Sequence, residues 1–166
     1  NRVCNVGISI YSDFPLNPLL SKFEPNIIQL PINVFDQRAI TNGILTALQS
    51  YDIEIHARSI FLQGMLIEKT ENIPNWLKQA RTSVENFQHR MSLIGVSPLE
   101  ATIAFLKTLN CFKVSIVGVK NKRELEDILS AGRVTVPHFR WHELAQTDVS
   151  LLDPRNWGKL RLQQNR

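Results

Sequence analysis

Hydrophobic and polar positions along the chain follow two periods in turn, which predicts strands that alternate with helices. Four short apolar runs rich in β-branched residues predict strands over 3–10, 27–30, 53–58 and 113–119. Between these runs, apolar residues recur at every third or fourth position, which is typical of a helix with one buried face. Short apolar strands separated by helices favour a parallel sheet with helices outside it.

The ends of the predicted helices are marked by proline, glycine and capping residues. The clearest start is Ser97-Pro98-Leu99-Glu100, where serine caps the helix, proline takes its first position and glutamate its third. Gly43 lies inside the second helix, where glycine costs about 1 kcal/mol relative to alanine. Helices are expected over 16–23, from Asp36 or Gln37 to Leu48, over 76–91 with a stripe of core residues that includes Trp76, Phe87 and Met91, behind Ser97-Pro98-Leu99-Glu100, and over 121–129. The third strand-helix unit thus holds one extra helix.

Chain length and element order together predict half of a (β/α)8 TIM barrel. A complete barrel needs about 250 residues, whereas this chain has 166 residues and the pattern of four strands. An open doubly wound sheet that binds a dinucleotide carries a glycine-rich first turn, and the sequence has none. We expect a single partial-barrel domain over 1–166, in which residues 134–166 form a C-terminal extension that packs on the body through Trp157.

The composition excludes several classes of partner. Apolar residues make up 43% and charged residues 20%, which is ordinary for a globular protein. The net charge is +4, but Lys and Arg are dispersed among acidic residues, so we expect no nucleic-acid partner. No apolar run approaches the roughly 18 residues of a membrane span, and no signal peptide is evident. Cys4 and Cys111 lack the spacing of a metal or redox site and are expected to be buried, reduced thiols of a cytoplasmic protein.

The stretch from Ile53 to Leu66 carries most of the functional information. It begins as an alternating strand and then turns into a loop that ends at Gly64. Because ligands gather at the carboxyl ends of parallel strands, this loop is a candidate ligand site. The four strand ends read Gly7-Ile8-Ser9, Ile28-Gln29-Leu30-Pro31-Ile32-Asn33, Ala57-Arg58-Ser59-Ile60-Phe61-Leu62-Gln63-Gly64, and Ile116-Val117-Gly118-Val119-Lys120-Asn121-Lys122.

In this order and spacing, the strand ends resemble the second half of the aldo/keto reductase family. The resemblance is closest to a bacterial branch that accompanies genes for sugar, flagellin or polysaccharide modification. Shared with that branch are Phe35-Asp36-Gln37-Arg38, the loop from Arg58 to Gly64, and the ending Leu152-Asp153-Pro154-Arg155-Asn156-Trp157. The resemblance implies a TIM barrel that binds NADP or NAD and reduces a carbonyl on a small-molecule substrate, and the branch suggests a sugar-derived one.

The resemblance also implies roles at the nicotinamide end of the cofactor. Ser9 would offer a hydroxyl to the carboxamide, although Ile10 stands where the family usually has asparagine. Gln29 matches the glutamine that holds the same carboxamide, and an amide buried in an apolar strand must in any case be hydrogen-bonded. Arg58 falls where many members stack a tyrosine on the nicotinamide ring, a role that a planar guanidinium can also take. Taken alone, Ser9 also fits a closely packed strand residue, and Arg58 a partly buried salt-bridge partner.

The loop after the third strand is expected to follow the pyrophosphate. It runs from Ser59 through Phe61 and Gln63 to Gly64, in register with the family's phosphate loop. Close approach to a phosphate requires backbone N–H groups and a permissive glycine, and this loop offers both.

The loop after the fourth strand matches the adenosine side of the family's site. Gly118, Lys120 and Lys122 belong to this loop, and Asp127 falls at an acidic position that often meets the adenine. Glu124 stands where members that prefer a 2′-phosphate carry arginine, so NADP and NAD both stay open. The cations that remain able to hold this phosphate, or that simply form a solvated face, are Lys120, Lys122 and Arg123.

The family's proton-donating machinery has no counterpart in this pattern. It consists of a tyrosine, a lysine, an aspartate and a histidine, all in the first half of the barrel. Tyr11, Tyr51 and His56 lack the companion lysine and aspartate in the needed order, so no catalytic residue is assigned. His138 and His142 lack the regular spacing of a metal site. We therefore expect the chain to be inactive on its own.

The missing machinery and the opening residue, Asn rather than Met, together suggest the C-terminal half of a reductase. A half barrel leaves two edge strands and one exposed core face, which usually end in pairing. We expect association with a missing N-terminal barrel half, or self-association through the exposed edges. The alternative is a non-catalytic fragment that binds a dinucleotide or has a structural or regulatory role.

Overall fold

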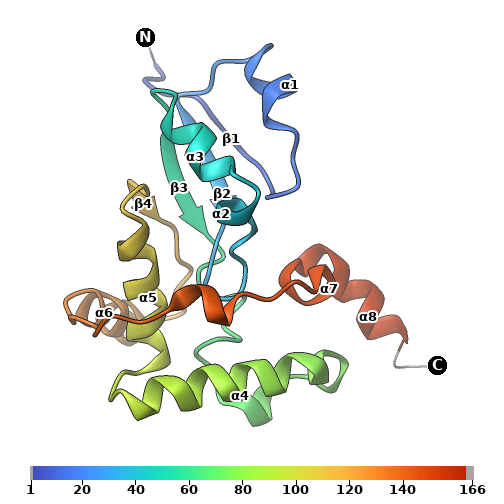
Figure 1. The fold of residues 1–166 in the computed structure, drawn as a ribbon, viewed down its shortest axis with the longest axis vertical. Coiled ribbons are helices and arrows are strands. Elements are labelled where there is room, and N and C mark those ends of the chain that lie inside the picture. Colours follow the sequence, from blue (N-terminus) through green and yellow to red (C-terminus); the bar gives the residue numbers. More distant parts are fainter. Residues whose placement is uncertain (1, 164–166) are drawn as a thin grey trace.

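The computed structural model describes residues 2–163 as an α/β fold with one parallel sheet (Figure 1). The four strands are β1 (Gly7–Ser9), β2 (Ile27–Pro31), β3 (Glu54–Arg58) and β4 (Val114–Ser115), and they lie side by side in that order. Every neighbouring pair is parallel. This confirms the predicted fold class, parallel strands alternating with helices as in part of a TIM barrel.

Helices connect the consecutive strands. α1 (Leu16–Leu20) joins β1 to β2, and α2 (Arg38–Thr41) with α3 (Ile44–Gln49) joins β2 to β3. Two 3-10 turns (Thr70–Asn72 and Asn75–Leu77), α4 (Lys78–Leu93) and α5 (Pro98–Leu109) precede β4, which confirms the extra helix of the third unit. After β4 come α6 (Lys122–Ala131), a 3-10 turn (Trp141–Leu144), α7 (Val149–Leu152), a 3-10 turn (Pro154–Asn156) and α8 (Trp157–Gln163).

Four predicted elements are clearly shorter than expected or interrupted. The first helix ends at Leu20 rather than at position 23. β1 covers only three residues, and the apolar residues before it, Val3 and Val6, are exposed. β4 is cut to two residues, since it pairs with β3 and, within residues 2–163, no strand lies on its other side. The second predicted helix breaks at Gly43, whose φ of 73° is left-handed, so that α2 ends before α3 begins.

The predicted start signal of α5 is present as hydrogen bonds, and α6 begins with a side-chain cap of its own. The Glu100 N–H donates to Ser97 Oγ over 3.2 Å, and the Ser97 N–H donates to Glu100 Oε2 over 2.7 Å, which completes a capping box. Asn121 caps α6 by accepting the Glu124 N–H at Oδ1 over 2.9 Å. Local sequence therefore determines where these two helices begin.

The two cysteines lie closer to solvent than expected. Cys4 is exposed, because the segment before β1 extends away from the core, so its predicted burial is wrong. Cys111 is half-buried, and burial raises the pKa of its thiol.

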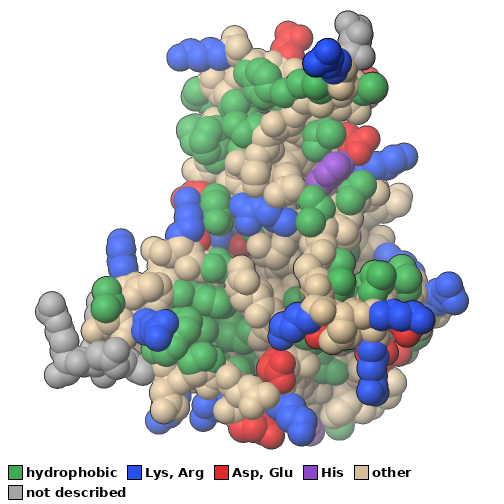
Figure 2. All heavy atoms as spheres, turned by 180° about the vertical axis from the view of Figure 1, so that it is seen from behind, with side chains coloured by type: hydrophobic (Ala, Val, Ile, Leu, Met, Phe, Trp, Pro, Cys, Tyr) green, Lys and Arg blue, Asp and Glu red, His purple; other side chains and the backbone are tan. Residues whose placement is uncertain are grey.

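Within residues 2–163, helices cover one face of the sheet and not the other (Figure 1). The buried residues on the covered face of β2 and β3 are Ile28, Leu30, Ile55 and Ala57, each at most 3% exposed. Between them Gln29, His56 and Arg58 alternate onto the other face, where they are half-buried. Figure 1 shows α2 and α3 in front of the sheet. Figure 2 shows the molecule from the opposite side, where hydrophobic side chains lie at the surface. The uncovered face corresponds to the lumen of a closed barrel.

The segment after α6 crosses back over the body of the molecule. The Gln37 side chain donates to the carbonyl of Trp141 over 2.7 Å, and the Gln146 N–H donates to the carbonyl of Phe35 over 2.9 Å. Further on, the rings of Trp157 and Trp76 meet edge to face at 5.7 Å between centroids. The division of the domain into a body and a C-terminal extension over 134–166 stays a prediction.

Candidate functional site

The carboxyl ends of β1, β2 and β3 bring four predicted site residues into one hydrogen-bonded group. The Ser9 hydroxyl donates to Gln29 Oε1 over 3.2 Å, as the register of β1 beside β2 allows. Arg58 at the end of β3 donates from Nε to Ser9 Oγ over 3.1 Å and from Nη1 to Ser59 Oγ over 3.2 Å. Its Nη2 donates to the carbonyl of Ile10 over 3.2 Å. The guanidinium therefore has a fixed orientation across three strands.

Tyr11 joins this group, although it is not among the predicted site residues. The guanidinium carbon of Arg58 lies 4.4 Å from the centroid of the Tyr11 ring, and that of Arg155 lies 3.5 Å from it. Cation–π attraction holds both arginines on the ring. Among residues 2–163, Arg58 forms no ion pair with a carboxylate, so the salt-bridge alternative for this residue is wrong.

The loop after β3 has an unusual backbone conformation. Ser59, Leu62, Gln63 and Gly64 have φ angles of 57°, 46°, 57° and 87°. A left-handed conformation at a residue other than glycine costs about 1–3 kcal/mol and is typical of ligand-binding loops. Buried Asn33 supports the loop by donating from Nδ2 to the carbonyl of Ser59 over 3.1 Å. The surrounding structure thus holds the loop in a conformation that its residues do not favour alone.

A cavity of about 230 Å³ joins this loop to the loop after β4. Gln63 and Gly64 line it together with Lys120. The course of a pyrophosphate along this loop stays a prediction. Trp76 and Trp157 also line it, so Trp76 is not only a core residue as predicted. Phe87 and Met91, by contrast, are fully buried in the core.

Other predicted residues lie outside this cavity. Phe61 is half-buried and accepts the Leu66 N–H at its carbonyl over 3.3 Å. Gly118 is exposed beyond β4, and Asp127 is exposed on α6. Lys122 points to solvent with 87% of its side chain exposed and pairs with Glu126 at 3.4 Å. The structure thus brings the adenosine-side residues less closely together than the residues at the strand ends.

Glu124 closes the loop after β4. Its Oε2 accepts the backbone N–H of Lys120 over 2.8 Å, and its own N–H is held by Asn121. A donor that a phosphate would use is therefore already bound to a carboxylate, which disfavours an anion at this point.

Two short turns of the pattern Asp-x-Arg each join a buried aspartate to an arginine. This pattern is the sequence signal by which Arg155 could have been found. Arg38 donates hydrogen bonds from Nε and Nη2 to the buried carboxylate of Asp36, each over 2.8 Å. Arg155 donates hydrogen bonds to the buried carboxylate of Asp153, from Nε over 3.0 Å and from Nη2 over 2.5 Å. In the sequence, the pattern occurs as Asp36-Gln37-Arg38 and again as Asp153-Pro154-Arg155.

The pKa shifts of Asp153 and Arg38 both favour the charged form of the group. Burial alone would raise the pKa of Asp153, but hydrogen bonds from Arg155 and its positive charge outweigh this and lower it. Hydrogen bonding to Asp36 raises the pKa of Arg38 above its usual value. Asp13, 3.6 Å from Arg155 Nη2, adds a third carboxylate to the group.

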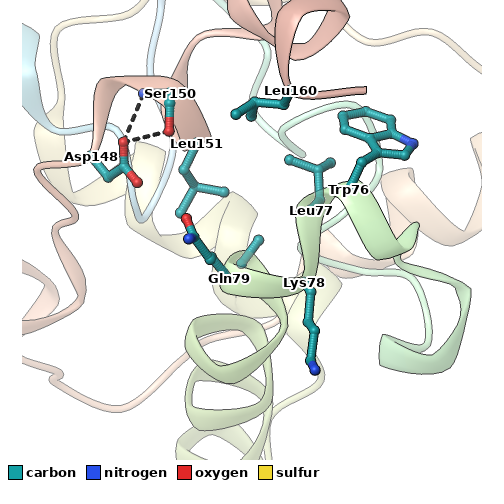
Figure 3. A pocket seen from close by; sticks show the side chains of 9 residues that line it. Trp76, Leu77, Lys78, Gln79, Asp148, Ser150, Leu151 and Leu160 are labelled. Atoms are coloured by element: carbon teal, nitrogen blue, oxygen red, sulfur yellow. Dashed lines mark hydrogen bonds between the residues drawn. The ribbon is translucent and has the colours of Figure 1, made fainter. Parts of the chain in front are cut away.

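A second cavity, of about 190 Å³, lies behind Trp76 and is drawn in Figure 3. The Asp148 carboxylate at its rim is bound to the N–H and hydroxyl of Ser150 over 2.9 Å and 2.6 Å. Lys78 points away from the cavity, which is lined by apolar side chains such as Leu77, Leu151 and Leu160 (Figure 3). The polar groups here serve the cap of α7 and give no sign of a reactive site.

Within residues 2–163, no group of three or more His, Cys, Asp or Glu side chains is arranged to hold a metal ion. In the same part of the chain, no single helix is long and apolar enough to cross a membrane. The helical stretches 75–93 and 98–109 reach that length and apolarity only when taken together, and they are bent by 88°.

Comparison with known proteins agrees with this geometry. A search of curated proteins finds no match to the chain. The model of the Aldo/keto reductase family matches residues 3–148, most of the chain. Members of this family generally reduce carbonyl groups with NAD(P)H. From this match, we conclude that the chain belongs to the aldo/keto reductase family.

Proposed function

We propose that this chain supplies the dinucleotide-binding part of an NAD(P)H-dependent reductase that acts on a carbonyl. The observation that carries the proposal is the hydrogen-bonded group of Ser9, Gln29 and Arg58 beside the left-handed loop at the strand ends. Bound there, the reduced dinucleotide would supply the hydride for the carbonyl carbon. A sugar-derived substrate is the finer part of the proposal and rests on the resemblance to the bacterial branch, and a cytoplasmic location stays a prediction.

The residues at the strand ends fit a carboxamide-bearing ring. Ser9 is exposed and Gln29 half-buried, so both polar groups are within reach of a ligand. The Gln29 oxygen is bound by Ser9, which leaves its NH2 group to donate to a carboxamide oxygen. Arg58 is planar and half-buried and offers a flat surface on which an aromatic ring stacks.

The loop from Ser59 to Gly64 fits a pyrophosphate. Its left-handed residues lie in a series of tight turns, and successive backbone N–H groups of a turn are able to form an anion-binding concavity. At Gly64 nothing lies within 4 Å of the place that a Cβ would take, so the loop leaves open space beside its backbone. Lys120 on the far side of the cavity adds a positive charge.

The described residues do not assemble a proton donor for the carbonyl oxygen. Tyr11 is engaged by two arginines, with no lysine and aspartate arranged around its hydroxyl among residues 2–163. We infer that the proton donor belongs to the other strands of the barrel. The chain on its own should therefore bind the cofactor without turning over a substrate.

Those other strands define the partner that we propose. Four parallel strands with open edges at β1 and β4 require another four-stranded unit to close a barrel. Exposed apolar side chains gather near both edges. They are Val3, Val6, Phe14 and Phe23 on the β1 side, and Val114, Ile116, Leu125 and Leu129 on the β4 side, between 37% and 65% exposed. We propose that a first barrel half covers them.

Titration of the chain with NADPH and NADH, followed by ligand fluorescence, tests the cofactor site. We expect saturable binding of at least one of them and no oxidation of either when carbonyl compounds are added. Absence of binding would overturn the proposal. Turnover by the chain alone would overturn the assignment of the proton donor to a missing half. If binding persists and a first half restores no turnover, the non-catalytic alternative is the correct one.

Sedimentation over a concentration series tests the edges. We expect the chain alone to self-associate, and Leu129→Lys to reduce this because it places a charge in the apolar edge. Leu93→Lys is the matched control, since Leu93 is 71% exposed at the end of α4 rather than at a sheet edge. A clean monomer at high concentration would contradict the proposed interface.

A further inference from the structure

The segment that follows the family match touches two parts of the candidate cofactor site, the nicotinamide end and the cavity proposed for the pyrophosphate. The match ends at residue 148, and the structure describes the chain up to residue 163. We call Asp153, Arg155 and Trp157 in this segment the C-terminal clamp. Asp153 is buried, whereas the Arg155 side chain is 49% exposed at the carboxyl ends of the strands.

The first arm of the clamp reaches the nicotinamide end. Asp153 fixes the plane of Arg155 through the fork of hydrogen bonds described above, and the guanidinium then lies 3.5 Å from the Tyr11 ring centroid. The same ring contacts Arg58 at 4.4 Å. Arg155 therefore acts on Arg58 through Tyr11, although the two arginines share no hydrogen bond among the described contacts.

What Arg58 does depends on its orientation. Its three hydrogen bonds to Ser9, Ser59 and Ile10 require the guanidinium to lie in one plane. A free Tyr11 ring would remove one of the surfaces that hold this plane. The exposed guanidinium of Arg155, whose partner Asp153 is buried and rigid, keeps the ring in place.

The second arm of the clamp reaches the cavity proposed for the pyrophosphate. The Trp157 indole N–H donates to the carbonyl of Leu151 over 3.0 Å, which sets the angle of the ring. The ring packs against Trp76 and lines the cavity that also contains Gly64 and Lys120. One short segment thus borders two parts of the candidate site that are formed by different loops.

We propose that the C-terminal clamp is a positioning element of the dinucleotide site. Arg155 holds Arg58 for the nicotinamide ring through Tyr11, and Trp157 forms a wall for the phosphates. This inference rests on the proposed function, because it assumes that the strand ends bind the dinucleotide. It adds that Tyr11 and Arg155 determine how tightly the nicotinamide is held, and Trp157 how tightly the pyrophosphate is held.

The test compares two ligands in the full chain: NADH, which has both ends, and ADP-ribose, which lacks the nicotinamide. Arg155→Gln should weaken NADH about fivefold to tenfold and leave ADP-ribose unchanged. Trp157→Leu should weaken both ligands, because both carry the pyrophosphate. Lys159→Gln is the matched control: it removes one exposed positive charge from α8 and should change neither affinity.

A purely structural role for Arg155 would give a different pattern. In that case Arg155→Gln would weaken both ligands equally, and the positioning role would be overturned. Tyr11→Leu provides a second route, because it should reproduce the loss for NADH alone, and combining it with Arg155→Gln should add no further loss. Additive losses in the double variant would also overturn the proposal.

The two proposals fail in different ways. If the unmodified chain binds neither NADH nor ADP-ribose, the proposed function fails and the clamp proposal with it. If the chain binds both and Arg155→Gln and Tyr11→Leu leave NADH unchanged, only the clamp proposal fails. The ring protons of Tyr11, observed by NMR, should shift in Arg155→Gln and not in Lys159→Gln.

Discussion

The two ends of the candidate cofactor site are built in opposite ways. At the nicotinamide end, hydrogen bonds join residues far apart in the sequence, with Ser9 bound to Gln29 across 20 positions and to Arg58 across 49. At the adenosine end, Glu124 binds Lys120 only 4 positions away. The first end therefore exists only when the sheet is formed, whereas the second is a local helix cap. A loss of tertiary structure should remove the first before the second.

The largest expected effect comes from Asn33, which joins two loops at the nicotinamide end. Its Oδ1 accepts the N–H groups of Phe35 and Asp36, and its Nδ2 donates to the carbonyl of Ser59. Asn33→Ala leaves buried polar groups without partners and should lower the free energy of unfolding by about 3 kcal/mol. Urea denaturation followed by circular dichroism measures this change.

Asn42→Ala is the control for this variant, because Asn42 is exposed and its Nδ2 donates to one backbone carbonyl, that of Ser12. It should destabilise the chain less than Asn33→Ala does. Equal destabilisation by the two variants would contradict the role given to the buried contacts of Asn33.

Arg58 is expected to have the next largest effect, on binding rather than on folding. Arg58→Met removes its three hydrogen bonds and its contact with Tyr11. The affinity for NADH and NADPH should fall by about tenfold, and equally for both, since the nicotinamide end is the same in each. Fluorescence titration measures both constants. Arg133→Met, which removes an exposed arginine beyond α6, is the control and should leave both constants unchanged. A selective loss of affinity for NADPH would contradict the assignment, because it would place Arg58 near the 2′-phosphate and not near the nicotinamide.

At the adenosine end, Asn121→Ala provides the counterpart of Asn33→Ala. Asn121 caps α6 with its side chain exposed, so the loss should be about 1 kcal/mol in the free energy of unfolding. The same urea experiment measures it. A loss as large as that of Asn33→Ala would contradict the view that this end is held locally.

The same contrast explains what the sequence could predict. The alternation in β2 and β3 determines which residues share a face, so Gln29 and Arg58 were located correctly at the strand ends. The start of α5 was equally clear, because a capping box needs only four consecutive residues. Tyr11 and Arg155 meet across most of the chain, and no local pattern specifies that contact. The short β4 and the break at Gly43 depend on edge exposure and backbone conformation, which composition does not reveal.

The smallest expected effect sharpens the comparison at the adenosine end, where the choice between NADP and NAD is open. Glu124→Gln keeps an acceptor for the Lys120 N–H and removes the negative charge. If a 2′-phosphate approaches this loop, its affinity should rise, so the ratio of NADPH to NADH affinity should increase by about twofold to fivefold.

Glu126→Gln is the matched control for that variant, because Glu126 is an exposed carboxylate on the same helix and pairs with Lys122. A local effect of Glu124 predicts a change in the ratio for Glu124→Gln only. Equal changes in both variants would indicate a general effect of charge. No change in the ratio for either variant would mean that the 2′-phosphate does not lie at this loop. An anion bound by the groups that Glu124 contacts must change its affinity when the negative charge of Glu124 is removed.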